Sequence, residues 1–309
     1  MTARCLEVLY AVEPLIPWRA YAFLAASTSL VGSYVGLSKL LVAAFPIFLL
    51  AGLRFGIAAV LMLPWLQKPA HEATLNARSR WLLFLESFLG NFLFSICLLY
   101  GLRQSSAVVA GVILAGIPAA VALLSWAFLR ERPSGRTLVG IGCAVGGIAL
   151  VATSSEGGSQ TTPLGALLLV AAVFCEACYV VIGKQLTADL GPKRISALIN
   201  LWGLALVAPL AIWQALSFDF GAPRAADWAL LAYYSATASI VTVWLWMAGL
   251  KGLPAAQAGV FMVFLPISTA LVGLLLGESL SARQALAFGL ALAGVLLATW
   301  PARTGPAQT

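Results

Sequence analysis

An internal repeat constrains this chain more than any other feature of its sequence. Residues 101–118 align without a gap with residues 249–266, at a shift of 148 positions, and seven of the 18 aligned residues are identical. Each copy carries Ala-Gly-Val and then a proline, and each is followed by a glutamate, Glu131 or Glu278. Such self-similarity must be settled before any other feature is interpreted, because it determines the architecture.

A second match lies upstream of the first. Tyr34 and Lys39 recur as Tyr179 and Lys184, at a shift of 145 residues. The repeated unit therefore spans nearly half of the chain, which predicts an internal duplication of one five-helix unit.

The composition places these helices in a membrane. The chain is 61% hydrophobic and 9% charged, with a mean hydropathy of +0.98, whereas soluble domains carry about 25% charged residues. Apolar runs of about 18 residues or more are long enough to cross the hydrocarbon core. The sequence predicts an all-α membrane protein with ten spans, at residues 19–38, 45–66, 81–101, 105–129, 136–153, 163–183, 194–216, 227–248, 254–276 and 283–301.

The distribution of Lys and Arg predicts how the spans are oriented. With ten spans, only Lys39, Arg103, Arg224 and Arg283 lie on one side, Arg54 lies inside a span, and the other 13 basic residues lie on the opposite side. The basic side is cytoplasmic by the positive-inside rule, so both termini are expected in the cytoplasm. A unit of five spans crosses an odd number of times, so its second copy enters from the opposite side. This arrangement is an inverted repeat, which is common in secondary transporters.

The predicted organisation has two repeats and three short connecting or terminal segments. An N-terminal segment covers residues 1–18, the first repeat 19–153 and the second repeat 164–301. A polar linker rich in Gly, Ser and Thr covers residues 154–163, and a C-terminal tail covers 302–309.

Several other functional classes are disfavoured by the residues. The net charge of +7 does not indicate nucleic-acid binding, because the basic residues lie in short loops between apolar runs. Cys175 and Cys178 have the spacing of a metal or redox motif, but a zinc site needs four ligands and the single histidine, His71, lies in a polar loop. No phosphate-binding loop of the ATPase type occurs. We therefore expect no metal, no cofactor, no nucleic-acid partner and no enzymatic activity.

The repeated segments resemble a known transporter family. The paired Ala-Gly-Val, proline and glutamate segments, the glycine-rich fifth and tenth spans and the Leu53-Arg54-Phe55 sequence are similar to the EamA branch of the drug/metabolite transporter superfamily. The resemblance implies two inverted five-helix repeats around a central cavity, with the fifth and tenth helices at the periphery. Members of this branch export amino acids and other metabolites, among them YddG-type exporters of aromatic amino acids.

Three ionisable residues inside the predicted spans are candidates for the transport site. Arg54, Glu86 and Glu176 lie at membrane depth, where charged side chains are rare and usually functional. One hypothesis makes them contacts for a zwitterionic substrate, or proton carriers. The alternative is a structural ion pair, for example between Arg54 and a glutamate. Glu176 is the strongest candidate, because Tyr179 lies three residues on and shares its helix face.

Polar and aromatic residues on other spans complete the candidate substrate site. On the third span a polar stripe is expected to face the cavity, although interhelical hydrogen bonding would also explain it. Trp202 and Trp244 lie deep enough to stack on a bound ring, whereas Trp246 is one of six tryptophans assigned to the interfacial belt. The matched tyrosines could line equivalent halves of a pathway. These remaining candidates are Tyr34, Asn91, Ser95, Tyr100, Tyr179, Trp202 and Trp244.

Pro118 and Pro266 are candidate hinges. They occupy matched positions near the middle of the fourth and ninth spans, where proline removes a backbone hydrogen bond and kinks the helix. The functional interpretation is a pair of equivalent gate helices, and the alternative is a static kink.

These observations favour a secondary transporter in the inner membrane that exports small metabolites by alternating access. Buried polar groups in a cavity with few charges favour amino acids with apolar or aromatic side chains. The alternatives are a multidrug or lipophilic-compound exporter on the same scaffold and, with less support, a membrane-embedded lipid enzyme. Proton coupling and facilitated diffusion both remain open.

Overall fold

The computed structural model describes residues 18–68, 75–129, 135–152, 161–251, 253, 258 and 261–299. Within these ranges the chain forms helices and turns and contains no strand, as the sequence predicts. The N-terminal segment 1–17, most of the linker, the C-terminal tail, His71 and Glu131 lie outside the described residues.

The first half of the chain contains helices that alternate with short connections. They are α2 (Trp18–Ala44), α3 (Ile47–Leu61), η1 (Leu63–Leu66), α4 (Ala77–Glu86), η2 (Ser87–Leu93), α5 (Phe94–Arg103), α6 (Ala107–Leu114), α7 (Ile117–Leu129) and α8 (Gly135–Ala152). Several of them begin at polar residues that accept a hydrogen bond from a free backbone amide of the first turn. Asn76 accepts from Ser79 before α4, and Ser106 accepts from Val109 before α6.

The second half contains α9 (Pro163–Asp189), α10 (Pro192–Ala215), α11 (Ala225–Ser235), η3 (Ala236–Val241), α12 (Thr242–Lys251), η4 (Phe261–Val263), α14 (Phe264–Leu275) and α15 (Ala282–Thr299). Proline occupies the first helical position of both α9 and α10, where its missing N–H removes no helical bond. Thr162 caps α9 by accepting from the Gly165 amide.

Helix lengths and hydropathy agree with a multi-pass membrane protein. Among the described residues, six helical stretches are long and apolar enough to cross a membrane: Trp18–Ala44, Ala77–Arg103, Ala107–Leu124, Pro163–Asp189, Pro192–Ala215 and Ala225–Lys251. Shorter apolar helices lie at Ile47–Leu61, Leu138–Gly147 and Phe261–Leu275.

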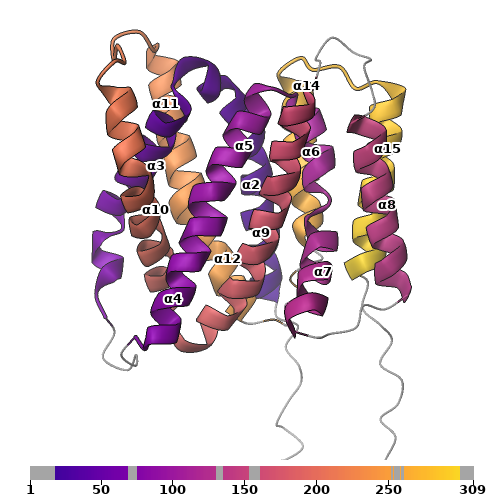
Figure 1. The fold of residues 1–309 in the computed structure, drawn as a ribbon, viewed down its shortest axis with the longest axis horizontal. Helices are drawn as coiled ribbons and strands as arrows, with labels where there is room; N and C mark the ends of the chain where they lie inside the picture. The colour runs from indigo at the N-terminus through magenta and orange to yellow at the C-terminus, as the bar shows by residue number, and fades with distance from the viewer. Residues whose placement is uncertain are drawn as a thin grey trace, which may run out of the picture.

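The helices form one bundle with a separate pair at its side (Figure 1). Helices α8 and α15 pack mainly against each other, at the edge next to α7. In the main bundle α2 packs against α14 and α12, α3 against α10, and α5 against α9. Helices from the two halves of the chain therefore make most of the close pairs. This interleaving places residues of both halves around the centre of the bundle.

Irregular helical turns occur at matched positions in the two halves. The π-helical segment η2 interrupts Ala77–Arg103, and η3 interrupts Ala225–Lys251 at a shift of about 148 residues. The helical hydrogen bonding also changes just before each repeated proline. Ala115 and Gly116 form a turn between α6 and α7, and the 3₁₀ segment η4 precedes α14. Such irregularities frequently mark functional sites in helices.

The glutamate at the end of the second repeated segment caps another helix. Both carboxylate oxygens of Glu278 accept hydrogen bonds, from the amides of Ala107 and Val108 at the start of α6, each at 2.9 Å. Gly277, at φ +86°, ends the preceding helix and turns the chain so that Glu278 reaches α6. The Glu278 amide bonds the Gly273 carbonyl, as in a Schellman cap. The carboxylate thereby satisfies two helix N-terminal amides with a favourable charge.

The duplicated lysines make equivalent contacts. Lys39 donates to the Ser105 carbonyl and lies 3.5 Å from a Glu278 carboxylate oxygen. Lys184 donates to the Leu253 carbonyl at 2.9 Å. Ser105 and Leu253 are themselves equivalent at the shift of 148 residues, so the repeat preserves the contact as well as the residue type.

Candidate functional site

A small polar cavity lies at the centre of the bundle. Its volume is about 40 Å³, which holds water but is well below the roughly 300–1,000 Å³ of ordinary ligand pockets. Helices of both halves supply its walls, including α2, α3, α9, α12 and α14. Five of the residues that the sequence marks as site candidates line it: Tyr34, Arg54, Asn91, Glu176 and Tyr179.

Arg54 supplies a buried positive charge to the cavity. Its side chain is 4% exposed, and its guanidinium lies 4.0 Å from the centre of the Phe55 ring. One terminal nitrogen donates to the Ser95 hydroxyl at 2.7 Å, while Nε has no hydrogen-bond partner. Among the described residues no carboxylate lies within ion-pair distance of Arg54. The structure thus shows no ion pair of the kind that the structural alternative requires.

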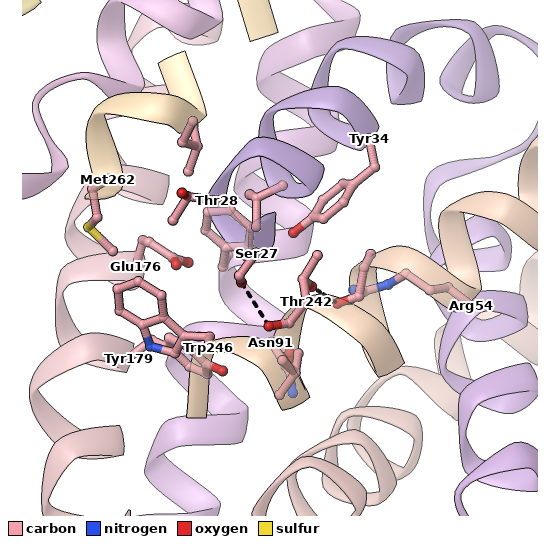
Figure 2. A pocket seen from close by; sticks show the side chains of 16 residues that line it. Ser27, Thr28, Tyr34, Arg54, Asn91, Glu176, Tyr179, Thr242, Trp246 and Met262 are labelled. Atoms are coloured by element: carbon pink, nitrogen blue, oxygen red, sulfur yellow. Dashed lines mark hydrogen bonds between the residues drawn. The ribbon is translucent and has the colours of Figure 1, made fainter. Parts of the chain in front are cut away.

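Glu176 supplies a carboxyl group from α9. It is partly buried and lines the same cavity, and Figure 2 shows Arg54 and Glu176 on different sides of it. Within the described part of the chain Glu176 forms no ion pair. A guanidinium and a carboxyl group therefore face one cavity without pairing with each other.

The two repeated tyrosines also face the cavity (Figure 2). Tyr34 packs edge-on against Tyr234, with ring centroids 5.5 Å apart. Tyr179 is 7% exposed and its hydroxyl has no hydrogen-bond partner. Its ring lies against Gly90 of η2, where an added Cβ would come within 2.5 Å of the ring. Glycine is required at that position because any side chain would displace Tyr179.

Other lining residues were not among the sequence candidates, and four of them carry groups that could contact a ligand. Trp246 is 4% exposed and lines the cavity. Its ring therefore points into the bundle, whereas the sequence assigned it to the interfacial belt. Its indole N–H has no partner. On α2, Ser27 donates to the Thr242 carbonyl and Thr28 to the Phe261 carbonyl, each at 2.8 Å. The fourth residue is Met262. Ser27, Val31 and Tyr34 are spaced so that they share one face of α2, and this spacing could have indicated from the sequence which face of α2 lines the cavity.

Glu86 lies outside the cavity lining. It is fully buried at the end of α4, and neither carboxylate oxygen has a hydrogen-bond partner. The nearest wall is Gly183 of α9, where an added Cβ would lie 2.8 Å from a Glu86 oxygen.

The polar residues that were expected to form one stripe on the third span have different surroundings in the structure. Asn91 lines the cavity, and Ser95 contacts Arg54 instead of lining it. Tyr100 packs against Phe48 with ring centroids 5.9 Å apart. Asn91 lies within the π-helical segment η2, whereas Ser95 and Tyr100 follow it in α5.

The two tryptophans proposed to stack on a substrate lie away from the cavity lining. Trp202 is 44% exposed on the outer face, where it contacts Phe84 edge-on at 5.4 Å between ring centroids. Trp244 packs near Phe23, with ring centroids 5.9 Å apart.

Both candidate hinge prolines are buried in the first turns of helices that follow an irregular segment. Pro118 is the second residue of α7, directly after the turn at Ala115 and Gly116. Pro266 lies in the first turn of α14, after η4. Proline in the first turn of a helix costs little stability, because the amide that it lacks would have no helical partner there. Each proline therefore favours a helix that begins at this point over one that continues through it.

Comparison with known proteins identifies the chain. The EamA-like transporter family matches residues 18–153 and again 163–300. The Bacillus subtilis (strain 168) protein named "Uncharacterized transporter YetK" is 36% identical over 265 residues, which cover 84% of this chain and 80% of that protein. The Escherichia coli (strain K12) protein named "Uncharacterized inner membrane transporter YedA" is 25% identical over 274 residues, covering 87% and 86%.

A solved crystal structure has the same overall fold. It superposes with a TM-score of 0.60 at 18% identity, covering 89% of this chain and 94% of that one. Two matches to one family in a single chain agree with the duplication found in the sequence. With an all-helical apolar fold, they establish that this multi-pass membrane protein belongs to the EamA-like transporter family and moves small molecules across a membrane.

Proposed function

We propose that this transporter exports amino acids with apolar or aromatic side chains. The observation that carries the proposal is a guanidinium and a carboxyl group that face one cavity without pairing, those of Arg54 and Glu176. A zwitterion presents a carboxylate and an ammonium group in one small molecule. The carboxylate would bind the Arg54 guanidinium, and the ammonium group would bind Glu176. Charge-assisted hydrogen bonds of this kind are about twice as strong as neutral ones.

The rest of the cavity lining suits an apolar side chain. Phe94, Met262 and Leu265 supply apolar surface, and Trp246 and Tyr34 supply rings on which an aromatic group can pack. The hydroxyl of Tyr179 and the indole N–H of Trp246 are without partners and can each hydrogen-bond a substrate. The cavity of about 40 Å³ must widen to hold one.

Alternating access in this proposal depends on ten spans arranged as two inverted repeats, at residues 19–153 and 164–301. The matched π-helical segments, the equivalent lysine contacts and the breaks before the two prolines support it. The segments that precede Pro118 and Pro266 would bend as equivalent gates, each opening the cavity to one side. The positive-inside distribution of Lys and Arg supports a cytoplasmic position for both termini.

Counterflow through the purified protein tests the substrate class. Proteoliposomes loaded with unlabelled L-phenylalanine should accumulate labelled L-phenylalanine transiently, and L-leucine should compete. The competing function, export of lipophilic compounds, predicts that a lipophilic cation such as tetraphenylphosphonium competes while amino acids do not. That pattern would refute the amino-acid proposal. Empty liposomes and liposomes with heat-denatured protein serve as controls.

A further inference from the structure

Glu86 is a buried carboxyl that the substrate cavity does not use. It is fully buried, it lies outside the lining, and both of its oxygens lack a hydrogen-bond donor. A charged carboxylate in such a place is strongly disfavoured, because neither water nor protein groups stabilise it. A neutral carboxylic acid is compatible with the site.

The charged groups around Glu86 do not offer it a counter-ion. Helix α4 packs against η2, α9 and α10, and η2 contributes no titratable group. From α9, Glu176 acts on Glu86 as a like charge, and Lys184 donates to two carbonyls, those of Leu250 and Leu253. Within the described residues no cation lies within ion-pair distance of Glu86. The remaining charges of these helices have other surroundings. Arg78 donates to Gln185, Lys193 lies over the Trp65 ring, Asp189 accepts from Ser79, Arg80 is exposed, and Arg194 has a contact of its own.

Residues of α9 and α12 lie close to the Glu86 carboxyl group. Gly183 of α9 faces it, and an added Cβ there would lie 2.8 Å from a Glu86 oxygen and 3.1 Å from the Met247 terminal methyl. A larger residue at this position would require one of these two flexible side chains to shift. The carboxyl therefore occupies a closed space between α9 and α12, which is apolar on the Met247 side.

Tyr179 connects this space with the cavity. Its side chain lines the cavity, and its ring lies on Gly90, one helical turn after Glu86. The hydroxyl is buried without a hydrogen-bond partner, so it is available as a donor between the cavity and Glu86. A conformational change in the cavity can therefore be transmitted to Glu86 through the Tyr179 side chain.

We propose that Glu86 is a proton-binding site, separate from the substrate site, that couples transport to a proton gradient. In the closed conformation the carboxyl carries a proton, because the site cannot stabilise the anion. Opening to the cytoplasm admits water, and the carboxylic acid releases its proton to that side, where the substrate then binds. After the substrate has left on the outer side, one carboxylate oxygen takes up a proton from there, and the protonated, substrate-free protein closes and returns. Each cycle exchanges one proton for one substrate molecule, and this coupling rests on the proposed amino-acid export.

Transport assays separate coupling from substrate movement. In wild-type proteoliposomes, an inside-acid gradient of one pH unit should drive accumulation of labelled L-phenylalanine by up to about tenfold for one proton exchanged. Glu86→Gln should keep counterflow but lose this accumulation, because its amide cannot release a proton. Glu278→Gln, which alters a carboxyl far along the sequence and outside the cavity lining, should retain the response to the gradient.

Two results would overturn the inference. One is wild-type counterflow that does not respond to the pH gradient, and the other is an unchanged response in Glu86→Gln. If wild type shows no counterflow with any amino acid, the proposed substrate class fails. Infrared spectroscopy of the substrate-free protein then decides on Glu86: the carbonyl absorption of protonated carboxyls at neutral pH should be weaker in Glu86→Gln than in wild type. Unchanged absorption in the variant contradicts the inference. Gly183→Ala, which crowds the carboxyl while leaving it titratable, should shift this absorption if Glu86→Gln does not fold.

Discussion

Replacing Glu278 by alanine removes the carboxylate that joins the loop before α15 to the start of α6. Two hydrogen bonds of 2.9 Å are lost, and the amides of two fully buried residues, Ala107 and Val108, lose their acceptor. A hydrogen bond to a charged group contributes about 1.5–3 kcal/mol. Water can replace part of this contribution, because the Glu278 side chain is 17% exposed. We therefore expect a loss of about 2–4 kcal/mol in the free energy of unfolding.

Two further variants separate the helix cap from the ion pair. Glu278→Gln keeps one acceptor oxygen and should lose about half as much as the alanine variant. Lys39→Met removes the ion pair and the hydrogen bond to the Ser105 carbonyl. It should cost about 1 kcal/mol, because the Lys39 side chain is 32% exposed, so that water can replace these contacts, and its ammonium group lies 3.5 Å from the carboxylate. Glu176→Gln is the matched control: it neutralises a carboxylate that bonds nothing among the described residues, so it should not destabilise the protein.

The stabilities of these variants are compared by thermal unfolding in detergent, followed by the fluorescence of the ten tryptophans. The expected ranking of stability is wild type with Glu176→Gln, then Lys39→Met, then Glu278→Gln, and finally Glu278→Ala. A Glu278→Ala protein as stable as wild type would show that the carboxylate does not hold α6. If Lys39→Met were the least stable variant, the ion pair and not the helix cap would be the main contribution.

Other predictions address the gates and the cavity. Replacing Pro118 and Pro266 together by alanine should slow counterflow, because alanine favours continuous helices over the observed breaks; unchanged transport would remove the hinge hypothesis. Gly90→Val should abolish transport of labelled L-phenylalanine while the protein remains folded by size-exclusion chromatography, because the new side chain meets the Tyr179 ring; normal transport would show that the ring position is unimportant. Trp246→Phe keeps a ring in the cavity but removes the indole N–H, so counterflow should persist with a weaker apparent affinity. Trp246→Ala should in addition lower the unfolding free energy by about 3–5 kcal/mol, as for other buried aromatic residues; a stable alanine variant would contradict the packing.

Apolar runs and the repeat predict much of this fold from the sequence alone. Hydropathy identifies helices because the lipid-facing surface must be apolar, and the all-helical class is confirmed. Helix ends are less well predicted. Helix α2 continues to Ala44 and α9 to Asp189, beyond the expected ends at residues 38 and 183. Polar residues and lysines can extend a helix past the hydrocarbon, so hydropathy alone ends these spans too early.

The candidate site is only partly predictable because helix register and rotation decide which residues face inward. Charge at membrane depth pointed to Arg54 and Glu176, and the repeat pointed to Tyr34. Glu86 ends α4 just before the π-helical segment η2, whereas Asn91 lies within it, and residue spacing does not indicate such an irregular turn.

Tryptophan positions show a second limit of the sequence. Position along a span distinguishes belt residues from deep ones, but it does not tell which way a ring points. Trp202 is deep in its span and faces outward, whereas Trp246 is near a span end and lines the cavity. Only the packing of neighbouring helices fixes these directions.

Competition by analogues that lack one charge tests the proposed recognition of zwitterions most directly. Counterflow of labelled L-phenylalanine is measured against phenethylamine, which lacks the carboxylate, and 3-phenylpropionate, which lacks the ammonium group. Each missing charge-assisted contact is worth about 1.5–3 kcal/mol, so each analogue should compete about 10–100-fold more weakly than L-phenylalanine. Arg54→Gln should remove the preference over phenethylamine, and Glu176→Gln the preference over 3-phenylpropionate. Equal competition by all three compounds in wild type would contradict the account.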